Sequence, residues 1–254
     1  MRVHAIQLDL VWQDRPANHA LARGAVEALR PDRGDLVVLP EMFAVGFTMN
    51  VDAVAGGAAE TDAFVSQLAR DFGVHVIAGN VRKPDDRGRN EALVYAPSGH
   101  LIVRFEKLHP FTFATEHQHY KGGDGVRLFQ WNGATVSPLI CYDLRFPEAF
   151  RLATKQGAEV LVVIANWPSA RVEHWVALLI ARAIENQAYV VGCNRVGSDP
   201  NVPGYPGRSV VIDPRGNTIA DAGAVTGVAS AEIDLVGLRE YRKAFPALND
   251  IRFI

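Results

Sequence analysis

EVLVVIANWP, at residues 159–168, places six apolar residues between a glutamate and an asparagine. A short, continuous apolar run rich in β-branched residues is typical of a strand that is covered on both faces. A similar stretch, DLVVLPEMF, occupies residues 35–43, and its apolar run is also flanked by an acidic residue and a polar one. The two stretches predict two buried strands, one in each half of the chain.

A second pair of similar stretches follows in the same order. YAPSGHLIVRF at 95–105 resembles IDPRGNTIADA at 212–222, and each contains a glycine turn of the kind that joins hairpin strands. Two repeats in one order indicate two related halves with one sheet each. No linker-like segment separates the halves, so we expect a single domain.

Segments with helical periodicity alternate with these strands, which is typical of sheets covered by helices on their outer faces. A helix predicted over 61–72 has Thr61 or Asp62 as its cap and ends at Gly73. The other predicted helices span 18–30, 147–155 and 171–186. The predicted strands span 3–8, 36–39, 74–78, 91–95, 101–105, 135–140, 160–165, 189–194, 209–212, 218–220 and 228–233.

The composition excludes several classes of protein. The 254 residues include 26 Lys and Arg against 28 Asp and Glu, a net charge of −2 that offers no broad cationic surface to nucleic acid or anionic lipid. No apolar run approaches the ~20 residues that span a bilayer, so we expect no membrane partner.

The N-terminal MRVHAIQLDLVWQDR reads as a strand rather than a signal peptide. Two cysteines without zinc-type spacing indicate a reducing, cytoplasmic setting.

Three polar residues follow apolar strands, at the strand ends where α/β proteins collect ligands. Glu41 follows LVVLP, Lys107 follows LIVRFE, and Cys141 follows VSPLI. Each also has an ordinary structural interpretation: a solvated glutamate, a lysine at a sheet edge, an inert core cysteine. Cys193, in VVGCNR, fits that last interpretation and receives no role.

Cys141 differs because CYDLRFPEAF follows it, with Pro147 and Glu148 suited to the first turn of a helix. A cysteine on a strand–turn–helix connection lies close to backbone N–H groups, which favour a thiolate and supply donors for an oxyanion. No histidine lies in the flanking turns. A Cys–His pair with the distant His4, His75 or His174 stays open but has no motif behind it.

LPEMFAVGF, RFEKLHPF and LICYDLRFPE, with ARAIENQAYVVGCNRVG and GRSVVIDPRGN, resemble the nitrilase, or carbon–nitrogen hydrolase, superfamily over residues 3–234. The resemblance implies an α/β fold, a four-layer α-β-β-α sandwich with two mixed sheets and helices outside, over residues 1–254 as one domain. It also implies a catalytic triad of Glu41, Lys107 and Cys141.

In that triad Cys141 would attack an amide carbon and form a thioester. Glu41 would move the protons, and Lys107 with the backbone N–H of Tyr142 would stabilise the oxyanion. The resemblance assigns Glu116, in FTFATEHQHYKGGD, to orient Lys107. A buried cation between a carboxylate and a thiol should favour ionisation of both.

His109, His117 and His119 lie near this loop, but HxH alone is a weak metal pattern, and the family needs neither metal nor cofactor. We therefore expect none. Motifs for dinucleotides, P-loops and serine hydrolases are missing from the sequence.

PEMFAVGFTMN, EHQHY, CYDLRFP and NWPSARVEHWVALLIARAIENQ look most like the ω-amidase branch, which releases ammonia from 2-oxoglutaramate or 2-oxosuccinamate. A nitrilase, an N-carbamoyl amidohydrolase or another small aliphatic amidase of the superfamily is the alternative. A non-catalytic binding member and a metal-dependent hydrolase are the more distant rivals.

A pocket for such a substrate needs an apolar wall along the carbon chain and a cationic group at the end that receives the carboxylate. The residues predicted to line the pocket are Phe43, Phe111, Asn166 and Trp167. Arg145 and Arg171 are candidate partners of the substrate carboxylate, although an ion pair of Arg145 with Asp143 or with another neighbour is the favoured interpretation of that arginine.

Residues 235–254 predict a short helix and a tail. YRKAFPALNDIRFI mixes bulky apolar residues with charged ones, and such a segment is expected to pack on another subunit. The resemblance points to a homodimer whose contacts include the helix after Cys141 and this tail.

Overall fold

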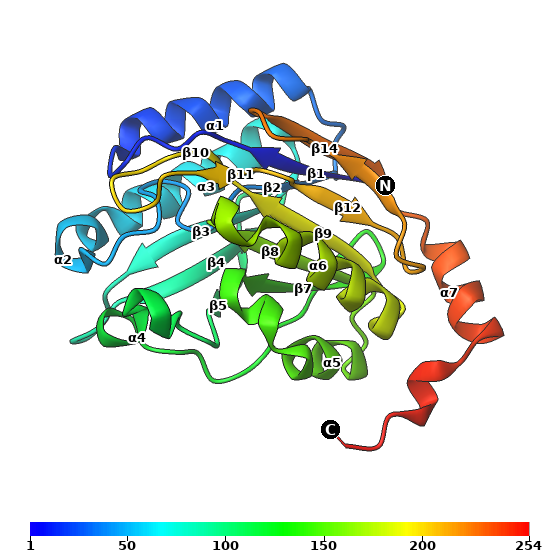
Figure 1. Cartoon of the computed structure of the whole chain (residues 1–254). Coiled ribbons are helices and arrows are strands. Elements are labelled where there is room, and N and C mark those ends of the chain that lie inside the picture. Colours follow the sequence, from blue (N-terminus) through cyan, green and yellow to red (C-terminus); the bar gives the residue numbers. More distant parts are fainter. Residues whose placement is uncertain (254) are drawn as a thin grey trace.

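Two six-stranded mixed sheets form the centre of the computed structural model, which describes residues 1–253 (Figure 1). The first sheet has the order β14-β1-β2-β3-β4-β5, in which β1, β2 and β3 run parallel and the other three are antiparallel to their neighbours. Its strands are β1 (Arg2–Gln7), β2 (Leu36–Val38), β3 (His75–Arg82), β4 (Arg89–Tyr95), β5 (Leu101–Glu106) and β14 (Gly227–Glu232).

The second sheet repeats this arrangement with the order β6-β7-β8-β9-β12-β13. Here β7, β8 and β9 are the parallel strands, and β12 and β13 follow as antiparallel ones, as β4 and β5 do in the first sheet. The prediction of two related halves is therefore confirmed. Its strands are β6 (Phe129–Trp131), β7 (Ala134–Ile140), β8 (Val160–Ala165), β9 (Tyr189–Asn194), β12 (Val210–Ile212) and β13 (Thr218–Asp221).

Three apolar clusters lie between the layers. The inner one joins the two sheets, for example through Val38 and Ile164. The second packs α1 (Arg15–Leu29) and α3 (Ala58–Phe72) on the first sheet, and the third packs α5 (Pro147–Lys155) and α6 (Val172–Asn186) on the second. The predicted four-layer α-β-β-α sandwich is therefore confirmed (Figure 1).

The burial of β2 and β8 on both faces explains their continuous apolar sequences. In β2, Leu36 and Val38 contribute to the inner cluster, whereas Val37 contacts the helices outside. Alternate side chains of a strand point to opposite faces, so both faces must be apolar when both are covered. This is why the two stretches that resemble each other predict the fold.

Several boundaries differ from the predicted ones. The helix predicted over 61–72 begins at Ala58, so neither Thr61 nor Asp62 caps it, and Thr61 is buried and accepts a hydrogen bond from Arg15 Nε. Gly73 ends this helix in a left-handed conformation, as predicted. The short elements without a predicted counterpart are α2 (Val51–Val54), α4 (Glu116–His119), β6, β10 (Val196–Gly197) and β11 (Tyr205–Pro206).

The C-terminal segment forms α7 (Leu235–Ala244) and a short 3₁₀ turn, Ala247–Asp250, which extend to one side of the sandwich (Figure 1). Leu238 packs into the inner cluster, but Val236, Phe245 and Phe253 are 69%, 58% and 96% exposed. Across residues 1–253, no helix has the length and apolar character required to cross a bilayer.

Gly79 in β3 lies directly against the turn that carries Glu41. A Cβ on Gly79 would lie 2.6 Å from the Cα of Glu41, and backbone atoms cannot move aside cheaply. We expect Gly79→Ala to lower the free energy of unfolding by about 1–3 kcal/mol, the usual cost of overpacking, in urea titrations. Gly24→Ala is the control, because an added Cβ in α1 meets nothing within 4 Å. An unchanged midpoint for Gly79→Ala would contradict the close approach.

Candidate active site

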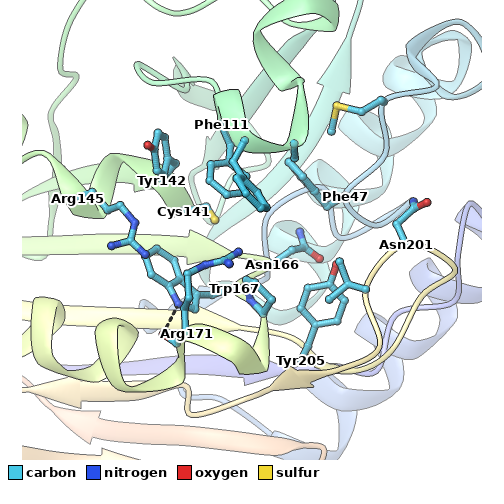
Figure 2. Close-up of a pocket in the computed structure, with 15 residues that line it drawn as sticks. Phe47, Phe111, Cys141, Tyr142, Arg145, Asn166, Trp167, Arg171, Asn201 and Tyr205 are labelled. Atoms are coloured by element: carbon cyan, nitrogen blue, oxygen red, sulfur yellow. Dashed lines mark hydrogen bonds between the residues drawn. The ribbon is translucent and has the colours of Figure 1, made fainter.

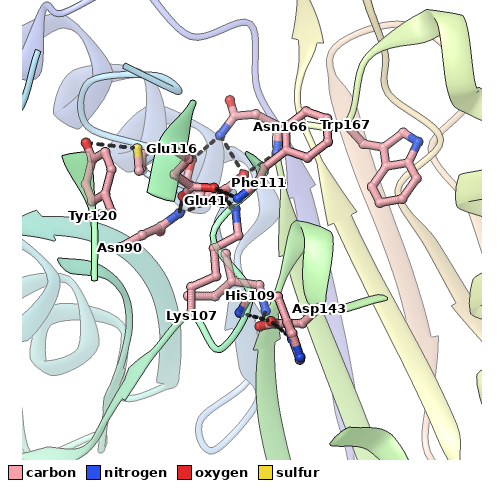
Figure 3. A network of polar contacts seen from close by, with 12 residues as sticks. Glu41, Asn90, Lys107, His109, Phe111, Glu116, Tyr120, Asp143, Asn166 and Trp167 are labelled. Carbon is pink, nitrogen blue, oxygen red and sulfur yellow. Dashed lines mark hydrogen bonds and ion pairs between the residues drawn. The ribbon is translucent and has the colours of Figure 1, made fainter. Parts of the chain in front are cut away.

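Glu41, Lys107 and Glu116 form a fully buried cluster beyond the ends of β2 and β5 (Figure 3). Lys107 Nζ lies 2.9 Å from Glu41 Oε1 and 2.9 Å from Glu116 Oε2, with Glu116 Oε1 at 3.2 Å. The structure thus brings together three of the four predicted catalytic side chains as one ion-pair network.

Amide N–H groups donate hydrogen bonds to the remaining acceptor positions of the two carboxylates. Asn90 Nδ2 donates to Glu41 Oε1 (2.7 Å) and to Glu116 Oε1 (3.0 Å). The backbone N–H of Asn166 donates to Glu41 Oε2 (2.8 Å), and that of Phe111 donates to Glu116 Oε2 (2.5 Å). Every carboxylate oxygen of the pair therefore has a partner, as buried charges require.

Asn90 is a residue that the sequence analysis missed. It lies near the start of β4, all seven residues of which are buried, and it bridges both carboxylates. Nothing in the local sequence RNEALVY distinguishes an asparagine that faces a charged cluster from one that pairs with the backbone.

Cys141 begins a 3₁₀ turn, Cys141–Arg145, and has a positive φ of 45°, which is rare for residues other than glycine. Asp143 holds this turn, since its Oδ2 accepts the N–H of Ile140 (3.0 Å). Its Oδ1 accepts the N–H of His109 and contacts His109 Nδ1, both at 2.9 Å. Asp143 therefore ties the cysteine turn to the loop that carries Lys107.

These contacts also account for His109, whose ring stacks on Phe146 with centroids 3.8 Å apart. His117 lies on α4 and is exposed, away from that contact. Within residues 1–253, no group of three or more histidine, cysteine or acidic side chains is placed to hold a metal ion.

Burial and the neighbouring charges together raise the pKa of the Cys141 thiol. Burial is the largest cause, and Glu41 adds to it, whereas Lys107 acts in the opposite direction. Burial alone would lower the pKa of Lys107, but Glu116 and Glu41 outweigh it and hold that pKa well above its usual value. The expectation that this site favours a thiolate is therefore wrong: the thiol stays neutral and the lysine stays charged.

Cys141 also faces a pocket of about 400 Å³ (Figure 2). Phe111, Asn166 and Trp167 line it, as the sequence predicts, and their contact with a substrate stays a prediction. Trp167 is held by a bond from its Nε1 to the carbonyl of Arg171 (2.7 Å). The other lining residues are Phe47, Met49, Phe113, Ala114, Tyr142, Arg145, Pro168, Arg171, Asn201, Val202 and Tyr205.

Phe43 does not line this pocket, so that prediction is wrong. Its side chain is fully buried under the outer helices and contacts the rings of His19 and Phe64. Phe47, four residues later in the same loop, takes the position at the pocket wall.

The predicted ion pair of Arg145 with Asp143 is also wrong, because Asp143 is committed to His109 and Ile140. The guanidinium of Arg145 lies over the ring of Trp167, 4.9 Å from its centroid, and its Nη2 is 3.2 Å from His174 Nδ1. Arg145 and Arg171 both line the pocket.

Comparisons with known proteins agree with this geometry. The carbon–nitrogen hydrolase family model matches residues 2–243. The chain therefore belongs to the carbon–nitrogen hydrolase family, and it is a hydrolase that acts on C–N bonds.

Relatives are similar over nearly their whole length. A protein from Escherichia coli (strain K12) named omega-amidase YafV is 41% identical over 98% of this chain and 96% of its own. A 2-oxoglutaramate amidase from Bacillus subtilis is 37% identical over 98% of this chain and 97% of its own length. The crystal structure of a CN-hydrolase superfamily protein from Xanthomonas campestris superposes with a TM-score of 0.90 at 32% identity, over 100% of this chain and 98% of that one.

The electrostatics predict how Cys141 reacts with iodoacetamide. Glu41→Gln removes a negative charge that raises the thiol pKa, so the midpoint of the pH dependence of alkylation should move to lower pH. Lys107→Met should have the opposite effect. The measurement is the pH dependence of alkylation, with the modified cysteine located by mass spectrometry.

Glu148→Gln is the matched control, because Glu148 is an exposed acid on α5 and should leave the profile unchanged. A midpoint that moves to higher pH in the Glu41→Gln variant would contradict the assigned charge balance.

Proposed function

We propose that the chain is an ω-amidase. It hydrolyses the terminal amide of a small 2-oxo dicarboxylic acid monoamide, such as 2-oxoglutaramate or 2-oxosuccinamate, and releases ammonia. The observation that carries this proposal is the position of Cys141, which lines the pocket and also experiences the charges of Glu41, Lys107 and Glu116.

In the acylation step, Glu41 removes the proton from the neutral thiol of Cys141 as the sulfur attacks the amide carbon. The C–N double-bond character is lost, and the carbonyl oxygen becomes an oxyanion that Lys107 and the backbone N–H of Tyr142 stabilise. Collapse of this intermediate breaks the C–N bond. Glu41 returns its proton to the leaving nitrogen, which departs as ammonia and leaves a thioester.

In the deacylation step, water attacks the thioester while Glu41 again accepts the proton. The same donors stabilise the second tetrahedral intermediate, which releases the carboxylic acid and restores the thiol. Glu116 acts as a positioning residue, since its carboxylate fixes Lys107 from the side opposite Glu41. No step requires a cofactor.

The proposed substrate class is supported by the lining of the pocket and by the relatives. Aromatic side chains form much of the wall, Arg145 and Arg171 are its charged members, and no aspartate or glutamate is among the lining residues. Relatives at 37–41% identity bear the names omega-amidase and 2-oxoglutaramate amidase. An anionic amide with a short carbon chain fits these features better than a neutral one.

A panel of substrates tests the proposal. We expect ammonia release from 2-oxoglutaramate and 2-oxosuccinamate, and little from glutamine, an N-carbamoyl amino acid or an aliphatic nitrile. Prior treatment with iodoacetamide should abolish the release, and a chelator should not. Preferential turnover of the nitrile or of the carbamoyl compound would move the chain to that branch of the family.

Cys141→Ala is the matched variant for this panel. It should fold as the wild type does, with an unchanged unfolding midpoint, and should lose turnover with every member. Cys193→Ala should retain activity, because Cys193 is fully buried between the sheets and outside the pocket. Activity of the Cys141→Ala variant would contradict the assigned nucleophile.

We further propose that the enzyme is a cytoplasmic homodimer and that the segment 235–254 packs at its interface. Both cysteines are free thiols, which suits a reducing compartment. The apolar side chains of Val236, Phe245 and Phe253 are largely exposed on one subunit, and a second subunit would cover them.

Light scattering after size-exclusion chromatography checks the oligomer. We expect twice the mass of one chain, and Phe245→Glu should shift the enzyme toward the monomer because it would bury a charge in an apolar contact. Val225→Glu is the control: Val225 is 70% exposed and lies in the turn between β13 and β14. A wild-type mass of one chain would refute the dimer.

A further inference from the structure

We infer that Arg171 is the residue that binds the carboxylate of the substrate and so sets the preference for anionic over neutral amides. This inference rests on the proposed function, because it assigns the part of the pocket that recognises the acid end of the molecule. The sequence offers Arg145 and Arg171 as candidates, and their surroundings in the structure distinguish them.

The guanidinium of Arg171 is uncommitted. Within residues 1–253 this side chain makes no hydrogen bond or ion pair. The hydrogen bond with Trp167 is made by the backbone carbonyl of Arg171, which accepts the indole N–H (2.7 Å). The guanidinium of Arg145, by contrast, contacts His174 Nδ1 at 3.2 Å. All five N–H donors of Arg171 are therefore available to a ligand.

Two aromatic rings lie beside this free guanidinium. Its central carbon lies 5.6 Å from the ring centroid of Phe111 and 5.8 Å from that of Phe113. Figure 2 shows Arg171 and Phe111 among the residues that line the pocket. A cation–π contact uses the flat face of a guanidinium, whereas the N–H donors lie in its plane. The rings accept no conventional hydrogen bond from Arg171, so contact with them leaves its N–H donors to a carboxylate.

The charge of the pocket points to the same ligand. Its fifteen lining residues include two arginines and no acidic side chain, so no internal carboxylate compensates Arg171. Water is excluded when a substrate fills the pocket, and an unpaired cation is then costly unless the substrate itself is an anion. A carboxylate matches the planar donor fork in two parallel hydrogen bonds.

The position of Arg171 also links recognition to catalysis. Phe111, under its guanidinium, donates its backbone N–H to Glu116, which in turn holds Lys107. A carboxylate bound at Arg171 would therefore be placed relative to the same loop that fixes Lys107. Binding the acid end there sets which carbon of the chain reaches Cys141.

The test compares kcat/KM for 2-oxoglutaramate and for pentanamide, a neutral amide of equal chain length. Arg171→Met keeps a long apolar stem on the rings but removes the charge. We expect kcat/KM for 2-oxoglutaramate to fall about 30-fold or more, mainly through KM, as for loss of one partner of a desolvated charge pair. The value for pentanamide should change less than about twofold, since it has no partner for the guanidinium.

A second measurement does not depend on turnover. The product 2-oxoglutarate should protect Cys141 of the wild type from iodoacetamide, and should protect the Arg171→Met variant only at much higher concentration. Arg171→Lys, which keeps the charge without the planar fork, should lie between the two.

Arg215→Met is the matched control. Arg215 also stacks on a ring, 4.4 Å from the centroid of Tyr241, but lies outside the pocket, so the same substitution should leave both rates unchanged. Equal losses for the two amides in Arg171→Met, or a selective loss in Arg145→Met alone, would overturn the assignment. A wild-type enzyme that prefers pentanamide would instead refute the proposed substrate class, which keeps the two failures distinct.

Discussion

The site depends on one buried cation. Lys107 carries its charge at a position that water does not reach, and removing an ammonium group from water costs several kcal/mol. Two carboxylates and the amide donors around them compensate this cost, and they come from three separate segments: Glu41 follows β2, Glu116 begins α4, and Asn90 lies in β4. Because a stranded buried charge is far more costly than a paired one, these segments cannot drift apart without exposing or unpairing Lys107. The ion-pair network therefore maintains the geometry of the site.

The same network leaves an excess of negative charge. Burial is the main cause of the raised pKa of the Cys141 thiol, and the two carboxylates around one ammonium add to it, because a thiolate would be a further anion in an already negative site. The chain thus keeps its nucleophile neutral at rest and places a proton acceptor beside it, which confines the reactive thiolate to the moment of attack. Cys193 shows that a raised pKa alone means little. Burial raises its thiol pKa too, but its Sγ lies 3.3 Å from the carbonyls of Ile6 and Val38, between the sheets. Cys141 differs from Cys193 because it faces a pocket and has the carboxylate of Glu41 nearby as a base.

Much of the fold can be predicted from the sequence, because a strand that is buried on both faces has a continuous run of apolar residues. The limits of β8, β9 and α5 agree with their prediction, since each has a continuous apolar run or a helical period with a proline at its start. Side-chain direction within irregular loops leaves no such pattern. Phe43 and Phe47 are both aromatic and lie in one loop, yet positive φ angles at Met42 and Gly46 turn the first into the core and the second toward the pocket. The direction of the thiol pKa could not be predicted for a similar reason, because it depends on how deeply Cys141 is buried and on which charges converge on it in space.

The internal repeat explains why the site lies where it does. Glu41 and Asn166 are the polar residues that follow the apolar runs of the two similar stretches, after β2 and β8, which occupy equivalent places in the two sheets. In the folded chain they contact each other: the N–H of Asn166 donates to Glu41 Oε2, and its side-chain amide donates to the carbonyl of Glu41 (2.7 Å). Two equivalent strand ends can meet only where the sheets face each other, so the repeat brings the ends of both halves to one place. The sequences then diverge in function, since one half supplies the carboxylate and the other supplies the cysteine, the tryptophan and the arginines of the pocket. A repeat in the fold thus becomes a single asymmetric site, with the base on one sheet and the nucleophile on the other.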